Sequence, residues 1–186
     1  MGRCMRLAAL IAIGLAGSAL AEWTDDAELC ATGFDIPEVI AACTSALEGG
    51  ALDTAETQST LNNRAWAYLE IQNTAAAMVD LNRAIKLDVM GGEAMAWNNL
   101  GRARWMERDL AGAAEAFHRA LAQLDLQGED GVTTGPGTLI DATTNLAILQ
   151  DELGNAEETR RWTEASFALV PDHAEMQALY ARFGLK

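Results

Sequence analysis

The residues best suited to acid–base or metal chemistry are few in this chain and far apart. Its two histidines, His118 and His173, are 55 residues apart. Neither stands at a metal-ligand spacing from a Cys, Asp or Glu, whereas protein zinc sites draw their ligands from short, fixed spacings. We interpret both as surface histidines, His118 on the outer face of a helix beside Arg119 and His173 in a loop after Pro171.

Sequence motifs of known catalytic centres are also missing. No Gly-x-Ser-x-Gly nucleophile motif occurs. The glycine-rich stretch Gly128–Gly137 lacks the Lys and the following Ser or Thr of a phosphate-binding loop. The nearby acids Asp125, Glu129 and Asp130 do not have the spacing of an EF-hand calcium loop. The sequence therefore predicts a protein that is not an enzyme and uses neither a metal nor another cofactor.

The charge of the chain narrows the class of partner. The 186 residues include 13 basic and 27 acidic residues, a formal net charge of -14. This excess argues against nucleic acid, whose phosphates Lys and Arg must neutralise, and against an anionic membrane surface. It favours a basic or neutral partner only weakly. Half of the residues are hydrophobic, which is enough to bury a core.

The first 21 residues have the pattern of an export signal. Arg3 and Arg6 precede a short apolar run, Leu7–Leu15, and Ala19–Ala21 gives a small-x-small cleavage site. The apolar run is shorter than the about 20 residues that a spanning helix needs. We therefore expect residues 1–21 to be removed during secretion across the inner membrane, and the mature chain to be periplasmic without membrane insertion. An uncleaved anchor is the alternative.

Export changes the interpretation of the cysteines. Cys4 leaves with the signal, and Cys30 and Cys43 remain as an even count in an oxidising compartment. A disulfide between these two is our first expectation, and two buried free thiols are the alternative. A zinc site is disfavoured because two Cys lack other ligands nearby.

The elements that must position any binding residues form an internal repeat. The segment from Asn62 to Ile85 aligns without a gap with the segment from Asn98 to Leu121, at an offset of 36 residues. The Asn pairs and the small residues coincide, and both segments end in Arg-Ala-aliphatic. A weaker copy follows around Asn145, and a truncated first copy precedes them.

This pattern resembles the tetratricopeptide repeat, a helix–turn–helix unit of about 34 residues with small residues where helices cross. The Pro that often closes such a unit is absent after the second and third units. The resemblance implies an all-α fold, an α-solenoid of antiparallel helix pairs over residues 22–186 with a C-terminal capping helix. The residues of the third unit that match the signature are Trp97, Leu100, Gly101, Ala113, Phe117 and Ala120. The expected units span residues 23–50, 58–91, 94–127 and 140–173, and the cap spans 174–184.

In a repeat of this type we interpret the small residues as contacts between packed helices, not as catalytic residues. Gly101 and Ala113 let two helices approach closely, while Phe117 fills the space between them. Cys30 and Cys43 fall on repeat positions that face each other within one unit, which supports the bridge. The expected helices are Thr24–Ala31, Pro37–Glu48, Thr57–Ile71, Thr74–Leu87, Glu93–Arg108, Leu110–Leu124, Thr138–Leu153, Ala156–Leu169 and Ala174–Phe183.

In this family the first helix of each pair lines the concave groove, and the family's groove positions identify candidate binding residues here. Asn amides can hold a peptide backbone, Trp is enriched at binding hot spots, Met adapts to apolar ligands, and Arg102 suits a carboxylate. The alternative is structural: the Trp side chains pack against a neighbouring repeat and the Asn side chains bond across helices. The candidates are Asn62, Asn63, Trp66, Leu69, Glu70, Met95, Asn98, Asn99, Arg102, Trp105, Met106, Asp141, Thr144, Asn145, Ile148 and Asp151.

One departure from the family's pattern argues against an acidic chaperone tail as the partner. Chaperone-binding members hold an acidic tail with a clamp of Lys, Arg and Asn. Asn63 and Asn99 match the Asn places, but basic places hold Thr24 and Met95.

We therefore predict a non-catalytic adaptor or assembly scaffold that binds a protein or peptide. The alternative is a small-molecule or lipid carrier with a closed apolar cavity. An enzyme would need a tight cluster among Asp141, Asp151, Glu70 and Arg102. Homo-oligomer formation through an exposed repeat end stays open.

Overall fold

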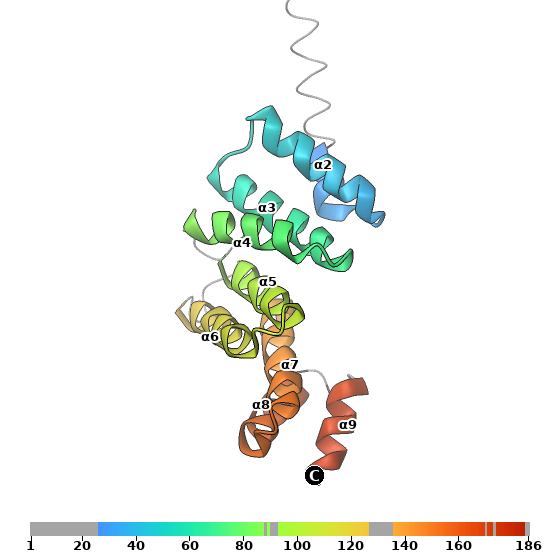
Figure 1. Ribbon diagram of the computed structural model, residues 1–186, viewed down its shortest axis with the longest axis vertical. Helices are drawn as coiled ribbons and strands as arrows, with labels where there is room; N and C mark the ends of the chain where they lie inside the picture. The colour runs from blue at the N-terminus through green and yellow to red at the C-terminus, as the bar shows by residue number, and fades with distance from the viewer. Residues whose placement is uncertain are drawn as a thin grey trace, which may run out of the picture.

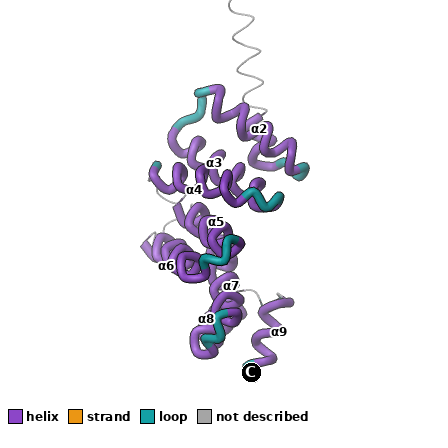
Figure 2. The backbone as a smooth tube through the Cα atoms, in the orientation of Figure 1, coloured by secondary structure: helices purple, strands orange, loops and turns teal. Residues whose placement is uncertain are grey.

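The computed structural model describes residues 26–87, 89, 93–126, 136–169, 171–172 and 174–184, and within them the regular secondary structure is entirely α-helical (Figure 2). The export signal, most of the glycine-rich loop and His173 lie outside the described residues. A helix over residues 26–32 precedes the others. These are α2 (Ile36–Gly49), α3 (Thr54–Glu70), α4 (Thr74–Lys86), α5 (Glu93–Met106), α6 (Leu110–Leu126), α7 (Pro136–Glu152), α8 (Ala156–Leu169) and α9 (Ala174–Arg182).

The helices stack in chain order along the long axis of the molecule (Figure 1). Each helix from α2 to α9 packs against the next, and the first helices of the pairs also touch each other, α3 with α5 and α5 with α7. At the C-terminal end α9 packs on α8, and the Phe167 and Tyr180 rings stack with centroids 3.9 Å apart. This arrangement confirms the predicted α-solenoid with its capping helix.

The turns that join α3 to α4, α5 to α6 and α7 to α8 have the same backbone geometry. Gln72, Arg108 and Gly154 occupy the same place in these turns and have positive φ of 59°, 64° and 75°. In each turn the next residue donates its N–H to the carbonyl five residues back, at 2.8 to 2.9 Å, as in a Schellman motif. The three turns thus repeat at the backbone level what the aligned sequences show.

Helix boundaries differ from the prediction where capping chemistry decides them. Helix α3 begins at Thr54 rather than Thr57, because Asp53 and Glu56 form a reciprocal capping box. Helix α7 begins at Pro136, since Pro is well tolerated in the first turn of a helix. The Asp109 side chain, just before α6, accepts a hydrogen bond from the Gly112 N–H at 3.0 Å, whereas the Asn155 side chain, just before α8, donates to Gln150 Oε1 at 2.7 Å.

The core lies between successive helices and is built from small residues and a few large ones. Ala113, Phe117 and Ala120 are fully buried. An ideal Cβ on Gly101 would lie 2.5 Å from Phe117 Cε1, so only a glycine allows the ring to sit against α5 at this distance. In α8 the small and medium residues that face the core are also fully buried, namely Thr159, Thr163 and Ser166.

Two cross-links hold the N-terminal part of the stack. Cys30 and Cys43 form the predicted disulfide, with Cα atoms 4.8 Å apart. Arg64 of α3 forms a bidentate pair with the buried Asp80 of α4, with Nε–Oδ2 and Nη2–Oδ1 distances of 2.7 and 2.9 Å, and donates to Thr44 of α2 at 3.0 Å. The hydrogen bond with Asp80 raises the pKa of Arg64. This network ties three helices together.

Candidate functional site

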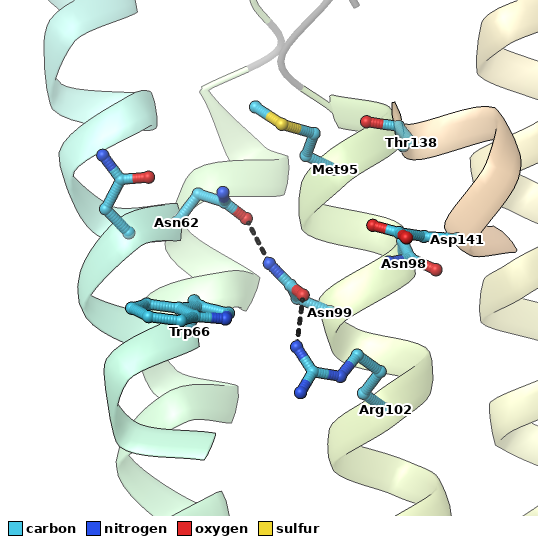
Figure 3. Close-up of a pocket in the computed structure, with 9 residues that line it drawn as sticks. Asn62, Trp66, Met95, Asn98, Asn99, Arg102, Thr138 and Asp141 are labelled. Carbon is cyan, nitrogen blue, oxygen red and sulfur yellow. Dashed lines mark hydrogen bonds between the residues drawn. The ribbon is translucent and has the colours of Figure 1, made fainter. Parts of the chain in front are cut away.

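The described residues form a pocket of about 220 Å³ on the face that the first helices share (Figure 3). Three successive helix pairs contribute to it through α3, α5 and α7. Its lining combines four amides, one indole, one thioether, one hydroxyl and two charged groups. The lining residues are Asn62, Asn63, Trp66, Met95, Asn98, Asn99, Arg102, Thr138 and Asp141.

Two amide pairs connect the first helices along this face. Asn99 Nδ2 donates to Asn62 Oδ1 at 3.0 Å, which joins α5 to α3. Asn145 Nδ2 donates to Asn98 Oδ1 at 3.1 Å, which joins α7 to α5. Because Asn98 is the repeat equivalent of Asn62 and Asn145 that of Asn99, the same bond is made at successive repeat interfaces. The structural alternative for these Asn residues is therefore realised.

The amide pairs do not exhaust the hydrogen-bonding capacity of this face. Each Asn side chain has two N–H donors and an oxygen with two lone pairs, and each inter-helix bond uses one donor and one lone pair. Asn62, Asn98 and Asn99 still line the pocket. The pairs thus hold the amides in fixed orientations at the pocket wall.

Arg102 is held by groups of its own chain. Its Nη2 donates to Glu70 Oε1 at 3.0 Å. Its Nη1 donates to Asn99 Oδ1 at 3.4 Å (Figure 3). The carboxylate that the sequence led us to expect from a ligand is thus supplied by α3. The positive charge on the pocket wall is offset before any partner arrives.

The apolar part of the pocket is provided by Trp66 and Met95. Each keeps 36% of its surface exposed. Figure 3 shows the Trp66 ring on the α3 side, separated from Asp141 on the α7 side by the α5 side chains. The pocket therefore has an aromatic wall and an acidic wall.

Eight of the predicted groove residues lie outside the pocket lining, among them Trp105, Met106 and Asn145. Trp105 is half-buried, packs edge-on against Phe117 with ring centroids 6.3 Å apart, and donates from Nε1 to Glu152 Oε2 at 2.6 Å. The hydrogen bond from Arg108, followed by that from Trp105, lowers the pKa of Glu152. Trp105 thus joins α5 to α7. Met106 is exposed at the end of α5, and the third residue, Asn145, bonds to Asn98.

Further groove candidates also have structural roles. Leu69 is 2% exposed and belongs to the core between α3, α4 and α5, so it does not line the groove. The Thr144 and Ser166 hydroxyls are 2.7 Å apart. Ile148 packs near Leu179 of α9.

Two of the acidic residues that the sequence offers for an enzyme site, Glu70 and Asp151, are paired with different arginines. Glu70 pairs with Arg102, whereas Asp151 accepts from Arg182 Nη1 of α9 at 2.9 Å. Within the described ranges no three His, Cys, Asp or Glu side chains gather at a distance that could hold a metal.

Sequence reasoning missed Thr138, which lines the pocket from α7. It stands three residues before Asp141 and seven before Asn145, on the same helical face. Continuing the stripe of groove positions by one turn toward the helix start would have identified it.

His118 lies on α6 and is exposed, as predicted, but is not isolated. Its ring stands 5.5 Å from that of Trp162 on α8. Although the residue is exposed, partial burial of its imidazole lowers the pKa of His118, while Glu158 opposes this effect. The contact joins α6 to α8, and neither helix contributes a residue to the pocket lining.

Comparison with known proteins gives a structural match and no sequence family. No family model matches the chain, and no curated protein matches its sequence. Among solved structures the chain is similar to the crystal structure of MamA protein, with a TM-score of 0.61 and 21% identical residues over 91% of this chain and 85% of that one. MamA is a helical protein of the tetratricopeptide-repeat type. At this identity the likeness shows the fold alone, a TPR-like solenoid.

None of the helices in the described part of the chain combines the length and apolarity needed to cross a bilayer.

Proposed function

We propose that this protein is a non-catalytic adaptor or assembly scaffold that binds a protein or peptide on the face formed by α3, α5 and α7. The observation that carries the proposal is the pocket, to which the first helices of three successive pairs each contribute. A TPR-like fold supports a role in protein interaction in general. This chain adds oriented amides, which suit a peptide backbone, beside the exposed indole of Trp66.

The carrier alternative is less well supported by the same pocket. Sites for drug-sized or larger small molecules are concave, mostly apolar and about 300–1,000 Å³. This pocket has about 220 Å³ and is lined mainly by polar side chains. A segment of another protein, anchored by one or two side chains, fits such a surface better than an enclosed lipid.

We place this function in the periplasm. The pattern of residues 1–21 supports export. The Cys30–Cys43 bridge is typical of an oxidising compartment and rare in the cytosol. Fractionation of cells, with the N-terminal sequence of the isolated chain, tests the location, and a cytosolic chain that retains Met1 would contradict it.

Affinity capture with matched variants tests the binding face. Trp66→Ala removes the pocket's indole, and Phe34→Ala removes an aromatic side chain that is 98% exposed outside the pocket. We expect a partner from envelope extract to bind wild type and Phe34→Ala but not Trp66→Ala, with circular dichroism showing that both variants fold. Equal capture by wild type and Trp66→Ala would contradict the proposed face. If the captured protein is a second copy of this chain, the scaffold is a homo-oligomer.

A further inference from the structure

We infer that the pocket recognises a proline-rich segment of a partner protein, bound in the polyproline II conformation through its main-chain carbonyl groups. This inference rests on the proposed function and names the chemistry of its partner. It follows from three side chains of the pocket wall whose N–H groups have no acceptor among the described residues. They are Asn62, Asn98 and Trp66.

The two amides are almost fully buried and yet open into the pocket. Asn62 and Asn98 are 5% and 4% exposed. Their Oδ1 atoms accept the inter-helix bonds from Asn99 and Asn145, whereas their Nδ2 atoms donate to no described residue. In the described part of the chain no sealed side-chain nitrogen or oxygen lacks a partner. Both Nδ2 groups must therefore reach the space of the pocket that these residues line (Figure 3).

Trp66 supplies a third donor beside these amides. An indole N–H usually finds a hydrogen-bond partner when it is buried. Trp105 and Trp162 follow this rule, since their Nε1 atoms donate to Glu152 and Glu158 at 2.6 and 2.9 Å. The Nε1 atom of Trp66 donates to no described residue, and the side chain keeps 36% of its surface exposed. A ligand that packs on this ring therefore also finds an N–H donor.

These donors require an acceptor on the ligand, and a main-chain carbonyl is the best match. The net charge of the chain is -14, which disfavours an anionic acceptor. A peptide carbonyl is uncharged and occurs at every residue. In a helix or a sheet this oxygen is already bonded, whereas a polyproline II segment has no internal hydrogen bonds. A segment in this conformation can therefore offer its carbonyls to the pocket.

The spacing of the two amides also favours polyproline II. Asn62 and Asn98 are equivalent residues one repeat apart, on helices α3 and α5, which pack against each other. The axes of packed helices are about 8–10 Å apart. A polyproline II segment that crosses them presents the same side every three residues, about 9.3 Å. A β-strand does so every two residues, about 6.7 Å, so the carbonyls of residues i and i+3 in polyproline II fit best.

Proline is the residue that stabilises this conformation. Its ring holds φ near the polyproline II value, and it has no N–H group of its own. Proline-rich segments also dock in grooves that are lined by aromatic side chains. Trp66 and Met95 provide the apolar contact for the rings. A second copy of this chain does not supply such a segment, because its three Pro residues stand singly.

Titration of the full chain with an acetylated and amidated decaproline peptide, followed by NMR, tests the inference. We expect the signals of the Nδ2 groups of Asn62 and Asn98 and of the Trp66 Nε1–H to shift. The indole signals of Trp105 and Trp162, whose N–H groups are bonded within the chain, should stay in place. A (Gly-Ser)5 peptide of the same length is a flexible coil and should bind at least tenfold more weakly.

A matched pair of variants tests the donors. Asn98→Asp keeps an oxygen for the bond from Asn145 but replaces the donors with a carboxylate. We expect it to weaken decaproline binding about tenfold or more. Asn82→Asp adds the same charge at an exposed position on α4 that does not line the pocket, and should bind like wild type. Circular dichroism checks that both fold, and the titration of wild type decides by itself if Asn98→Asp does not.

The outcomes separate the inference from the proposed function. Decaproline that binds without shifting the three signals, or that binds folded Asn98→Asp as tightly as wild type, would overturn the inference. Equal binding of the Gly-Ser peptide would overturn the preference for polyproline II. If decaproline does not bind, the inference is wrong, and the affinity capture described above decides on the binding face. A partner lost with Trp66→Ala leaves that face standing, and no such partner overturns both.

Discussion

At the scale of single residues, Gly101 sets the distance between α5 and α6. A Cβ at this position would lie 2.5 and 2.6 Å from two carbons of the Phe117 ring. Phe117 is fully buried and packs edge-on against Trp105. The ring therefore has little freedom to move away from an added methyl group, because interiors are packed as densely as organic crystals.

We expect Gly101→Ala to lower the free energy of unfolding by about 1–3 kcal/mol, the usual effect of overpacking. This loss would exceed the gain of up to about 1 kcal/mol that Ala brings over Gly inside a helix. Gly137→Ala is the control, because nothing lies within 4 Å of a Cβ there. Urea unfolding followed by circular dichroism measures both, and stabilisation by Gly101→Ala would contradict the close approach.

His118 gives a pH dependence whose sign is defined. Partial burial of the imidazole holds its pKa below the ordinary value of 6.5 in the folded chain, so the unfolded chain binds the proton more readily. The contribution of His118 to stability is present above pH 6.5 and is lost as the pH falls through the lower folded pKa. Glu158 and Arg161, which lie on α8, modulate this effect without reversing it.

We therefore expect wild type to lose stability between pH 7 and pH 5 with a steeper slope than His118→Gln. Gln keeps a polar side chain of similar reach beside Trp162 and does not titrate. Urea unfolding at several pH values gives the two slopes. Equal slopes would mean that His118 titrates alike in the folded and unfolded chains.

At the scale of elements, the turn inside each helix pair depends on a residue with left-handed backbone. Gly154 meets this requirement at no steric cost, whereas Gln72 and Arg108 do so with side chains. For a residue with a Cβ the left-handed conformation costs about 1–2 kcal/mol. The repeated Schellman geometry therefore includes strain in two of these three turns.

We expect Gln72→Gly to stabilise the protein by about 0.5–1 kcal/mol, the relief of strain less the greater entropy of Gly in the unfolded chain. Gln72 is the cleaner site, because Arg108 also pairs with Glu152. Thermal unfolding measures the change. Gln72→Ala should leave stability nearly unchanged, and a loss with Gln72→Gly would show that its side chain contributes more than its backbone costs.

Most elements were predictable because the same local signals recur at a fixed offset. Asn98 and Gly101 repeat the pattern of Asn62 and Ala65, and α4, α6, α8 and α9 begin at the predicted residues. The ends that were missed depend on side-chain geometry. The capping box of Asp53 and Glu56 adds three residues to the start of α3, and the helical spacing of apolar residues does not indicate it.

At the scale of the whole molecule, the pocket was less predictable than the fold. Repeat positions identified Asn62, Trp66 and Arg102 as groove residues, because this assignment depends only on which helical face each residue occupies. The repeat positions did not reveal that Arg102 would pair with Glu70 or that Trp105 would bond to Glu152. These pairings join residues 32 and 47 positions apart, and the side-chain reach across two repeats decides them.

Because the helices of the stack contact mainly their neighbours, we expect the disulfide to stabilise only the N-terminal unit. In a solenoid each unit contacts only its neighbours, so a change in one unit propagates weakly. Helix 26–32 and α2 are joined by Cys30 and Cys43, and closing a loop of this size contributes about 3 kcal/mol in the chain-entropy model. Among α3 to α9, α3 is the helix that packs extensively on α2.

We therefore expect reduction to release the N-terminal unit while the rest of the stack stays folded. Hydrogen exchange with and without reductant should show protection lost over residues 26–49 and retained from α5 to α9. Cys30→Ala, Cys43→Ala should reproduce the reduced pattern, and reductant should not change that variant further. Loss of protection along the whole chain would instead show that the N-terminal unit is coupled to α9 through the entire stack, and that the repeats unfold as one cooperative unit.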